Sequence, residues 1–207
     1  MYQLRLRTMS ASPTAHAPRR GRPPAASRED VLDVALSAYL HGVRIDVQAI
    51  AAEVGLGRTT IYRWFGSREG LLGEVVVRAA EPLFDEARAG ARGRGGAALL
   101  DTFDRINRAL AAAPALRRFL ELERDALRIL TSSGGVVHSR AVAKIHGFIA
   151  DEVRSGAYHP PVDPATLAYA IVRLAEAFLF NDATAAVRGD VERLREIEGA
   201  LLGVRPA

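Results

Sequence analysis

The sequence predicts an all-α fold in which a small three-helix unit is followed by a larger helical body. Apolar residues recur at helical spacing through most of residues 27–202, and no run shows the period-two alternation of a half-buried strand. Residues 46–72, DVQAIAAEVGLGRTTIYRWFGSREGLL, indicate two short helices joined by a glycine-bearing turn. A further helix begins at Ser67, so these residues have the pattern of a helix-turn-helix.

Composition narrows the class of protein. A chain of 207 residues is long enough for a sizeable core, as one domain or as two. The absence of Cys excludes disulfides, Cys-based metal sites and Cys nucleophiles. No apolar run reaches the roughly 18 residues of a membrane span. Arg5 and Arg7 are not followed by the apolar segment of a secretory signal, so we expect a cytoplasmic protein.

The positive charge is concentrated toward the N-terminus. The first 80 residues contain 11 basic and 7 acidic side chains, whereas residues 81–207 contain 17 of each. A basic end on a neutral body indicates that this end contacts a polyanion. The alternative is a basic tail that only improves solubility.

Residues 1–26 are expected to form a disordered basic arm, because they are rich in Ala, Ser, Pro and Arg and show no periodicity. Either Met1 or Met9 can be the first residue of the natural protein. The segment Arg19–Pro24, RRGRPP, resembles the core of an AT-hook. Such a segment lies along the narrow minor groove, so we expect Arg20 and Arg22 to contact DNA there.

Local signals define the three helices of the small unit. Ser27 is a suitable N-cap for a first helix that ends at about Gly42. Asp46 caps the second helix, Gly55 supplies the tight turn, and Gly57 opens the third helix.

The third helix presents polar side chains that suit the major groove. At 100° per residue Ile61 and Phe65 share the inner face, so Thr59 and Arg63 point away from the core. Arg can contact guanine with two hydrogen bonds, Thr can contact a thymine methyl group or a phosphate, and Tyr can reach the backbone. An ordinary solvated helix face is the alternative. The residues expected to meet DNA from this helix are Arg58, Thr59, Thr60, Tyr62 and Arg63.

Residues 28–76 resemble the DNA-binding domain of TetR-type transcriptional regulators. The residues that carry the resemblance are Ile50, Ala51, Val54, Gly55, Thr60, Ile61, Tyr62, Phe65, Ser67, Glu69 and Leu71. The resemblance implies that Tyr62, Trp64 and Arg68 hold phosphates. It also implies that bases or backbone are contacted by Arg58, Thr59, Thr60 and Arg63.

Four positions depart from the family pattern. Gly57 replaces a hydroxyl residue, and Trp64 and Arg68 stand where His and Lys are common. Asp46 stands where a Thr often contacts the backbone, so we expect Asp46 to act only as a cap. The segments 46–51 and 66–69 also resemble a smaller subset, the regulators of lactone catabolism.

Pro82 interrupts the helix that begins at Ser67, because proline removes a backbone hydrogen bond. Pro82 either kinks or breaks this helix at a hinge or starts a new helix at its first turn. We expect a helix-turn-helix DNA-binding domain at 27–80 and a ligand-binding and dimerisation domain at 81–207.

The body is expected to contain helices at 97–112, 115–131, 136–155, 164–184 and 190–202. The family resemblance implies that this body dimerises and binds a small molecule. The run 167–180 is apolar nearly all round, which suits burial against both its own core and a second subunit.

Candidate effector-binding residues interrupt or end the apolar stripes of the body. A ligand pocket combines an apolar wall with a few polar groups, although each candidate could instead be a core or rim residue. His138 and His146 are too far apart on one helix to bind a metal ion without other donors, so we expect no metal site. The candidates are Asn107, Glu123, His138, His146, Phe178 and Asn181.

The sequence therefore predicts a homodimeric DNA-binding regulator, a repressor that an unidentified small-molecule effector releases from a double-stranded operator. The alternative is a low-specificity architectural DNA-binding protein without an effector. We expect neither an enzyme nor a cofactor, because no nucleophile–base pair or paired carboxylate set is found. The Gly-rich segment 90–96 lacks the Lys of a phosphate-binding loop.

Overall fold

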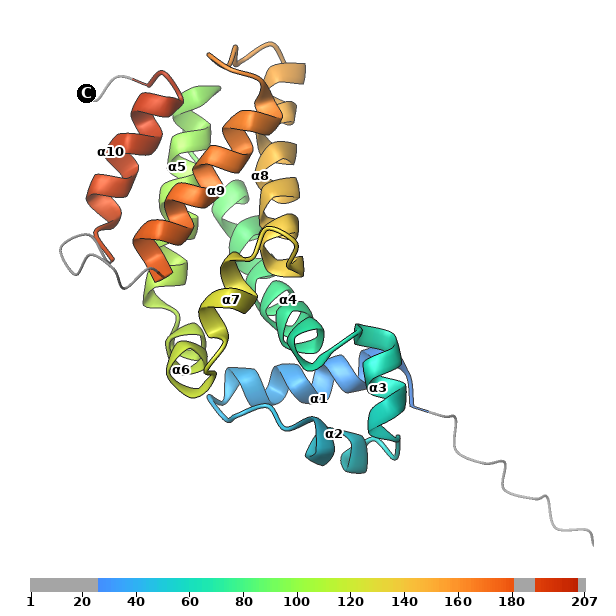
Figure 1. Ribbon diagram of the computed structural model, residues 1–207. Coiled ribbons are helices and arrows are strands. Elements are labelled where there is room, and N and C mark those ends of the chain that lie inside the picture. Colours follow the sequence, from blue (N-terminus) through green and yellow to red (C-terminus); the bar gives the residue numbers. More distant parts are fainter. Residues whose placement is uncertain (1–25, 181–188, 205–207) are drawn as a thin grey trace, which may run out of the picture.

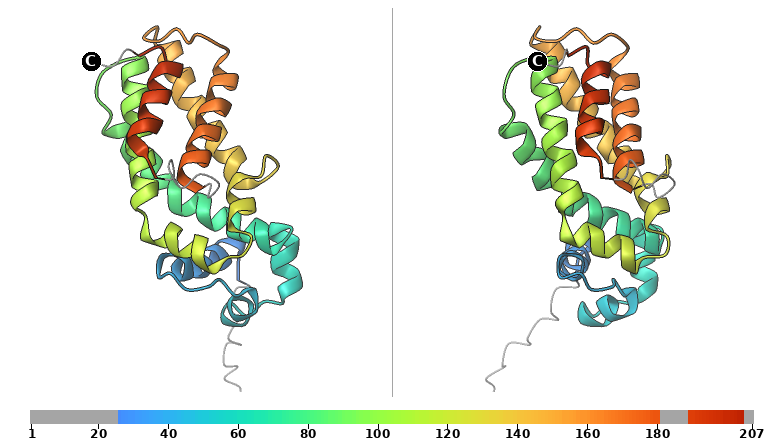
Figure 2. Two further views of the ribbon diagram at one scale, coloured as in Figure 1. Left: turned by 60° about the vertical axis from the view of Figure 1, so that its left-hand side comes forward. Right: turned by 90° about the vertical axis from the view of Figure 1, so that its left-hand side faces the viewer.

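The computed structural model describes residues 26–180 and 189–204, and the regular elements within them are all helices. Helices α1 to α3 lie at one end, α4 leads from them into the body, and α5, α8, α9 and α10 stand side by side there (Figures 1 and 2). The bounds are α1 Arg28–Leu40, α2 Val47–Glu53, α3 Arg58–Phe65, α4 Arg68–Ala89, α5 Gly96–Ala112, α6 Pro114–Leu122, α7 Ala126–Thr131, α8 Val136–Arg154, α9 Pro164–Phe180 and α10 Val191–Leu201.

The caps predicted for the small unit are confirmed. The Ser27 hydroxyl accepts a hydrogen bond from the Asp30 backbone N–H, and the Asp30 carboxylate accepts one from the Ser27 N–H, which completes a capping box. The Asp46 carboxylate accepts a hydrogen bond of 2.8 Å from the Gln48 N–H at the start of α2. Gly42 and Gly55 have φ values of 66° and 69°, a conformation that glycine adopts at little cost.

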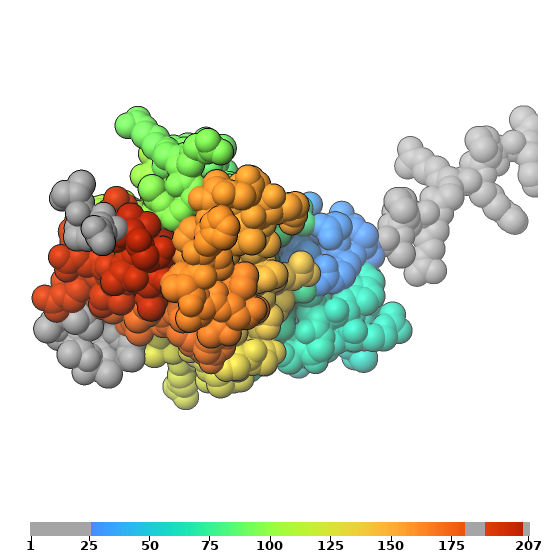
Figure 3. Space-filling model, turned by 90° about the horizontal axis from the view of Figure 1, so that it is seen from above, coloured from blue at the N-terminus to red at the C-terminus, as the bar shows by residue number. Residues whose placement is uncertain are grey.

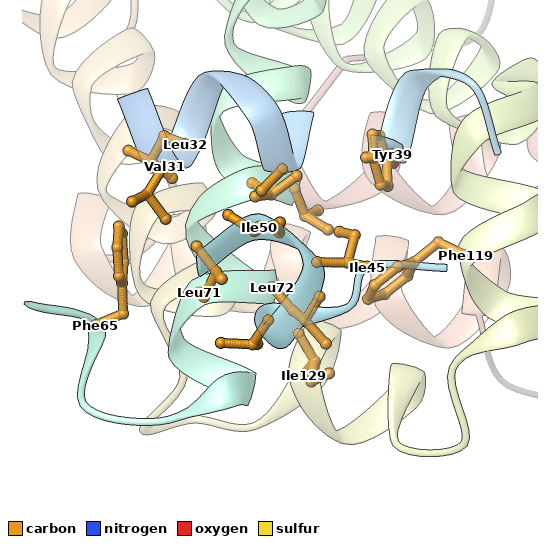
Figure 4. Close-up of a cluster of buried hydrophobic side chains, with 14 of the residues drawn as sticks. Val31, Leu32, Tyr39, Ile45, Ile50, Phe65, Leu71, Leu72, Phe119 and Ile129 are labelled. Carbon is orange, nitrogen blue, oxygen red and sulfur yellow. The ribbon is translucent and has the colours of Figure 1, made fainter. Parts of the chain in front are cut away.

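The core beneath α3 continues into the body. Ile61 and Phe65 are buried as predicted, together with Leu71 and Leu72 of α4 (Figure 4). The same cluster contains buried side chains of α6 and α7. The ring of Tyr39 in α1 packs edge-on against that of Phe119 in α6, with 5.9 Å between the ring centroids. Tertiary packing therefore joins α1–α4 to the part of the body formed by α6 and α7.

Helix α4 runs without interruption from Arg68 to Ala89 and contains Pro82 in its interior. The alternative that Pro82 starts a new helix is therefore wrong. Because α4 contacts α1 and α3 of the small unit as well as α5 and α8 of the body, one helix spans both parts of the chain.

One helix expected in the body is divided in two. Residues 115–131 were expected to be continuous, but the chain leaves the helix at Glu123, with φ −102° and ψ 115°, and resumes at Ala126. No Gly or Pro lies at this break. The Glu123 carboxylate instead accepts hydrogen bonds from Arg68, so a distant partner holds the chain at this turn.

A second hydrophobic core joins α5, α8, α9 and the end of α10. It contains Leu99 and Phe103 of α5, Ile149 of α8, Ile171 of α9 and Leu202 after α10. Seen from above, α10 in red lies beside the orange segment where α8 gives way to α9, and the blue and teal helices project from one side (Figure 3). No helix in the described parts of the chain is long and apolar enough to cross a bilayer.

Candidate nucleic-acid interface and ligand cavity

The outer face of α3 carries the exposed side chains predicted for it. Arg58, Thr59 and Arg63 are exposed, and Ile61 and Phe65 are buried on the opposite face. Within residues 26–180 and 189–204, the side chains of Thr59 and Arg63 make no hydrogen bond, so their polar groups face solvent. Thr60, Tyr62 and Trp64 are half-buried along the flanks.

Gln48 lies beside the third helix, although it is not among the residues predicted from the sequence. Arg58 Nη1 lies 3.5 Å from Gln48 Oε1, and the Arg58 guanidinium lies 6.0 Å from the centre of the Tyr62 ring. Gln48 is exposed in the first turn of α2. A Gln side chain can form paired hydrogen bonds with adenine, so Gln48 extends the polar surface onto α2. Its only sequence signal is a polar side chain two residues after the cap Asp46.

The end of α3 is fixed from α1 and α4. The Arg28 guanidinium stacks over the Phe65 ring at 4.5 Å and pairs with Glu74 of α4 at 3.0 Å. These contacts hold the inner face of α3 while its outer face remains exposed. Arg20 and Arg22 of the predicted arm lie outside the described residues.

Arg68 and Glu123 differ from their expected roles. Arg68 Nη2 donates hydrogen bonds to both carboxylate oxygens of Glu123, at 2.8 and 2.9 Å, and to the Ile45 carbonyl at 3.2 Å. The Nη2 end of the guanidinium is thus engaged within the protein, while the Arg68 side chain as a whole remains 29% exposed. Glu123 stabilises the junction between α4 and α6. It is not one of the residues that line the cavity between α4, α5, α8, α9 and α10.

The body contains a partly open cavity of about 430 Å³ between α4, α5, α8, α9 and α10. Its wall is mainly apolar and includes side chains of every one of these helices, with Glu198 as the contribution of α10. Small-molecule sites are commonly of this size and combine apolar walls with a few polar groups. The main apolar lining residues are Val76, Phe103, Ile106, Leu116, Ile171 and Phe180.

Asn107 lies in this wall, where it bonds to Glu198 of α10. Asn107 Nδ2 donates to Glu198 Oε1 at 3.0 Å and to Oε2 at 3.2 Å. Burial raises the pKa of Glu198 to about 8, and the hydrogen bond from Asn107 opposes this rise. Glu198 is not among the residues predicted from the sequence, although it shares a helical stripe with Leu194 and Leu201 and so has the same kind of sequence signal as Glu123.

Glu176 of α9 also lines the cavity, but both of its carboxylate oxygens have partners. His138 Nδ1 lies 2.7 Å from Oε1, and Arg173 Nη1 donates to Oε2 at 2.7 Å. His138 is buried behind Glu176 and outside the wall, and its ring packs edge-on against that of Tyr169.

The other expected ligand contacts are not in the wall. His146 is exposed. Phe178 is buried beside the lining face of α9, which Ala175 and Leu179 supply. Asn181 lies outside the described residues. Of the five candidates that lie among the described residues, the structure brings Asn107 alone to the cavity wall, and it adds Glu176 and Glu198.

Comparisons with known proteins agree with this arrangement. The family described as "Bacterial regulatory proteins, tetR family" matches residues 38–75, and "Tetracyclin repressor-like, C-terminal domain" matches residues 94–203. No curated protein matches the sequence.

The solved structures that are similar to this chain include two repressors. The transcriptional repressor QsdR of the TetR family from R. erythropolis is 28% identical, with a TM-score of 0.80 and coverage of 87% of this chain and 96% of that chain. The TetR family repressor AlkX from Dietzia sp. strain DQ12-45-1b, implicated in biodegradation of n-alkanes, shares the fold at 21% identity and a TM-score of 0.54. Coverage there is 86% of this chain and 97% of that chain. With its helix-turn-helix unit and its helical body both matched, this chain belongs to the TetR family of transcriptional regulators.

Proposed function

We propose that the protein is a ligand-responsive repressor that binds an operator as a homodimer and leaves it when a small molecule enters the cavity. The main support is the position of α4. Val76, Val77 and Ala80 of this helix line the cavity, while Leu71 and Leu72 pack in the core beneath α3. A ligand in the cavity thus contacts the helix that carries the DNA-binding unit. A ligand that binds one orientation of α4 more tightly shifts the population toward that orientation.

The proposed DNA contacts follow from exposure. Arg58, Thr59 and Arg63 face the bases, with Thr60, Tyr62 and Trp64 contributing at the flanks. Arg20 and Arg22 add minor-groove contacts from the arm. Arg68 is not among these contacts, because its guanidinium is paired with Glu123.

Dimerisation is proposed through α9 and α10. A single recognition helix reads only a few base pairs, and a two-fold pair of helices doubles the contact with DNA. Tyr169 of α9 and Ile197 of α10 are large apolar residues that remain 47% and 36% exposed in the single chain. The narrower resemblance to regulators of lactone catabolism remains part of this proposal, as an expectation about the class of ligand.

Operator binding is tested by titrating the full-length protein with its own upstream DNA and with a scrambled duplex of equal length and composition. We expect the upstream DNA to bind at least about a thousandfold more tightly at physiological salt. Equal affinity for both duplexes, with a steep salt dependence, would instead support the architectural alternative.

Effector release is tested with the same operator complex. Adding an organic extract of the source culture should dissociate the wild-type complex. Ala141→Trp, which places an indole in the cavity wall, should bind the operator and resist release. Equal release of both proteins would show that the cavity is not the effector site.

A further inference from the structure

Asn107 and Glu198 form a buried polar pair in an otherwise apolar part of the cavity wall. We propose that the cavity takes a neutral, largely apolar molecule whose carbonyl oxygen accepts a hydrogen bond from the carboxylic acid of Glu198. This inference rests on the proposed function, since it names the ligand class of the proposed effector site.

The position of Glu198 makes it a polar anchor for a ligand. Its side chain is fully buried on α10, which packs against α5 and α9, and it also lines the cavity. Both of its oxygens lie within hydrogen-bond distance of Asn107 Nδ2. The amide N–H of Asn107 is therefore directed to Glu198, and a proton held by Glu198 is the donor that remains for a ligand.

The surrounding charges do not give Glu198 an ion-pair partner. In the described parts of the chain, no cationic nitrogen lies within 4.0 Å of its carboxylate. Asp104 of α5 disfavours the ionised form, whereas Arg195 of α10 favours it from beside Asp104, at 3.3 Å from the Asp104 carboxylate. Burial is the largest influence, and it raises the pKa of Glu198 to about 8. Glu198 is thus mostly a neutral hydrogen-bond donor at pH 7.

Glu176 is the acidic group that faces the cavity from α9, and it is already satisfied. His138 and Arg173 occupy the two carboxylate oxygens of Glu176, so this residue is less available than Glu198 for a hydrogen bond to a ligand. Glu176, His138 and Arg173 are also the charged neighbours of the cavity that can contribute to a pH dependence of ligand binding. A comparison with a Glu198 variant separates their contribution from that of Glu198.

An anionic ligand fits this site poorly. The cations that line the cavity are Arg140 and Lys144 of α8. Arg140 is exposed, and Lys144 Nζ lies 2.6 Å from Asp85 Oδ1. Their charges are therefore directed to solvent or to Asp85, while the buried ionisable groups of the wall, Glu176 and Glu198, are acidic. A cationic ligand remains the competing class, because it would pair with an ionised Glu198.

A matched pair of probes distinguishes the neutral class from the cationic class. N-octylpyrrolidone and N-octylpyrrolidine share a ring and an alkyl chain, but the first presents a neutral carbonyl and the second a cationic amine. Calorimetric titration of the full-length protein at pH 7 should show about tenfold tighter binding of the pyrrolidone. Its affinity should fall about tenfold between pH 7 and pH 9, because Glu198 loses the proton that it donates.

Two variants test whether Glu198 causes this behaviour. Glu198→Gln retains an N–H donor in a similar shape, so its affinity at pH 7 should stay within about threefold of the wild type and become independent of pH. Glu192→Gln is the matched control on α10, since Glu192 is exposed and pairs with Arg108 outside the cavity. It should retain the wild-type pH profile. Circular dichroism confirms that each variant is folded.

Three results would overturn the ligand class. These are tighter binding of the pyrrolidine, a pH dependence that Glu198→Gln retains, and no binding of the pyrrolidone up to its solubility limit. Operator titrations on the same samples separate this result from the proposed function. Operator preference without pyrrolidone binding overturns the ligand class alone, whereas pyrrolidone binding without operator preference overturns the regulatory function alone.

Discussion

Arg68 joins the DNA-binding unit to the body by donating hydrogen bonds to both carboxylate oxygens of Glu123, at 2.8 and 2.9 Å. Arg68 is the first residue of α4, and Glu123 immediately follows α6. The same Arg68 nitrogen donates to the Ile45 carbonyl just before α2. One guanidinium therefore links three segments, and the side chain of Glu123 is only 4% exposed.

We predict that Arg68→Ala lowers the free energy of unfolding by about 3 kcal/mol, because it leaves a buried carboxylate without its main partner. Arg44 Nε lies 3.9 Å from the same carboxylate but is 69% exposed, so it can replace only part of the lost interaction. Urea unfolding followed by circular dichroism measures the change.

The matched control for this prediction is Arg118→Ala, which removes an exposed pair with Glu121. Surface pairs of this kind contribute at most about 1 kcal/mol. An equally small effect of Arg68→Ala would show that the Arg68–Glu123 pair does not stabilise the junction.

A second prediction concerns the outer face of α3. Arg63→Ala should weaken operator binding by about 1–3 kcal/mol and relax the sequence preference at one operator position, because an exposed Arg on this face can contact a guanine. Fluorescence anisotropy with a set of single-base operator variants measures both effects. Arg154→Ala, at an exposed position on α8, should leave binding unchanged. A uniform loss across all sequences would mean that Arg63 contacts only phosphate.

A third prediction follows from the raised pKa of Glu198. This carboxyl has a pKa of about 8 in the folded protein and its ordinary value of 4.5 when unfolded. Between these values the folded protein holds a proton that the unfolded chain releases. Stability should therefore fall as pH rises through this window, by about 1 kcal/mol per pH unit from this group.

Glu198→Gln cannot ionise and should lack this contribution. The stability of the variant relative to the wild type should thus increase steadily from pH 5.5 to pH 7.5 in urea unfolding experiments. The comparison cancels other titrating groups, including His138 and Glu176. A constant difference across this range would show that Glu198 is ionised in the folded protein.

The small unit could be predicted because its signals are local. Ser27 and Asp30 lie within one helical turn of each other, and Gly55 allows the backbone conformation of the turn. Helical periodicity also predicts that Ile61 is buried and Arg63 exposed, because a short helix that buries a single face can pack on the core in few orientations.

The junction and the cavity depend on residues that are distant in the sequence. Glu123 and Glu198 both lie within apolar stripes of the body, and a single-helix pattern does not distinguish them. Glu123 meets Arg68, 55 positions away, and the helix ends there. Glu198 meets Asn107, 91 positions away, at the cavity wall. Only the packing of helices decides which buried acid stabilises a junction and which faces a cavity.

A fourth prediction concerns the close approach of α4 to α8. A Cβ added at Gly73 would lie 2.5 Å from Val136 Cγ1, at the start of α8. Replacing Gly by Ala inside a helix normally stabilises it by about 1 kcal/mol. Forcing an extra methyl group into a packed site costs about 1–3 kcal/mol, and the short branched Val136 cannot swing aside. Gly73→Ala should therefore destabilise the protein by about 1 kcal/mol in urea unfolding.

Val136→Ala provides the test of this cause, because it removes the methyl group that the new Cβ would meet. The double variant should be more stable than the sum of the two single effects predicts, by about 1 kcal/mol or more. Simple additivity would mean that α4 and α8 separate at little cost. Gly73 lies in α4 between the core beneath α3 and the cavity-lining residue Val76, so such freedom would also weaken the proposed transmission of ligand binding through this helix.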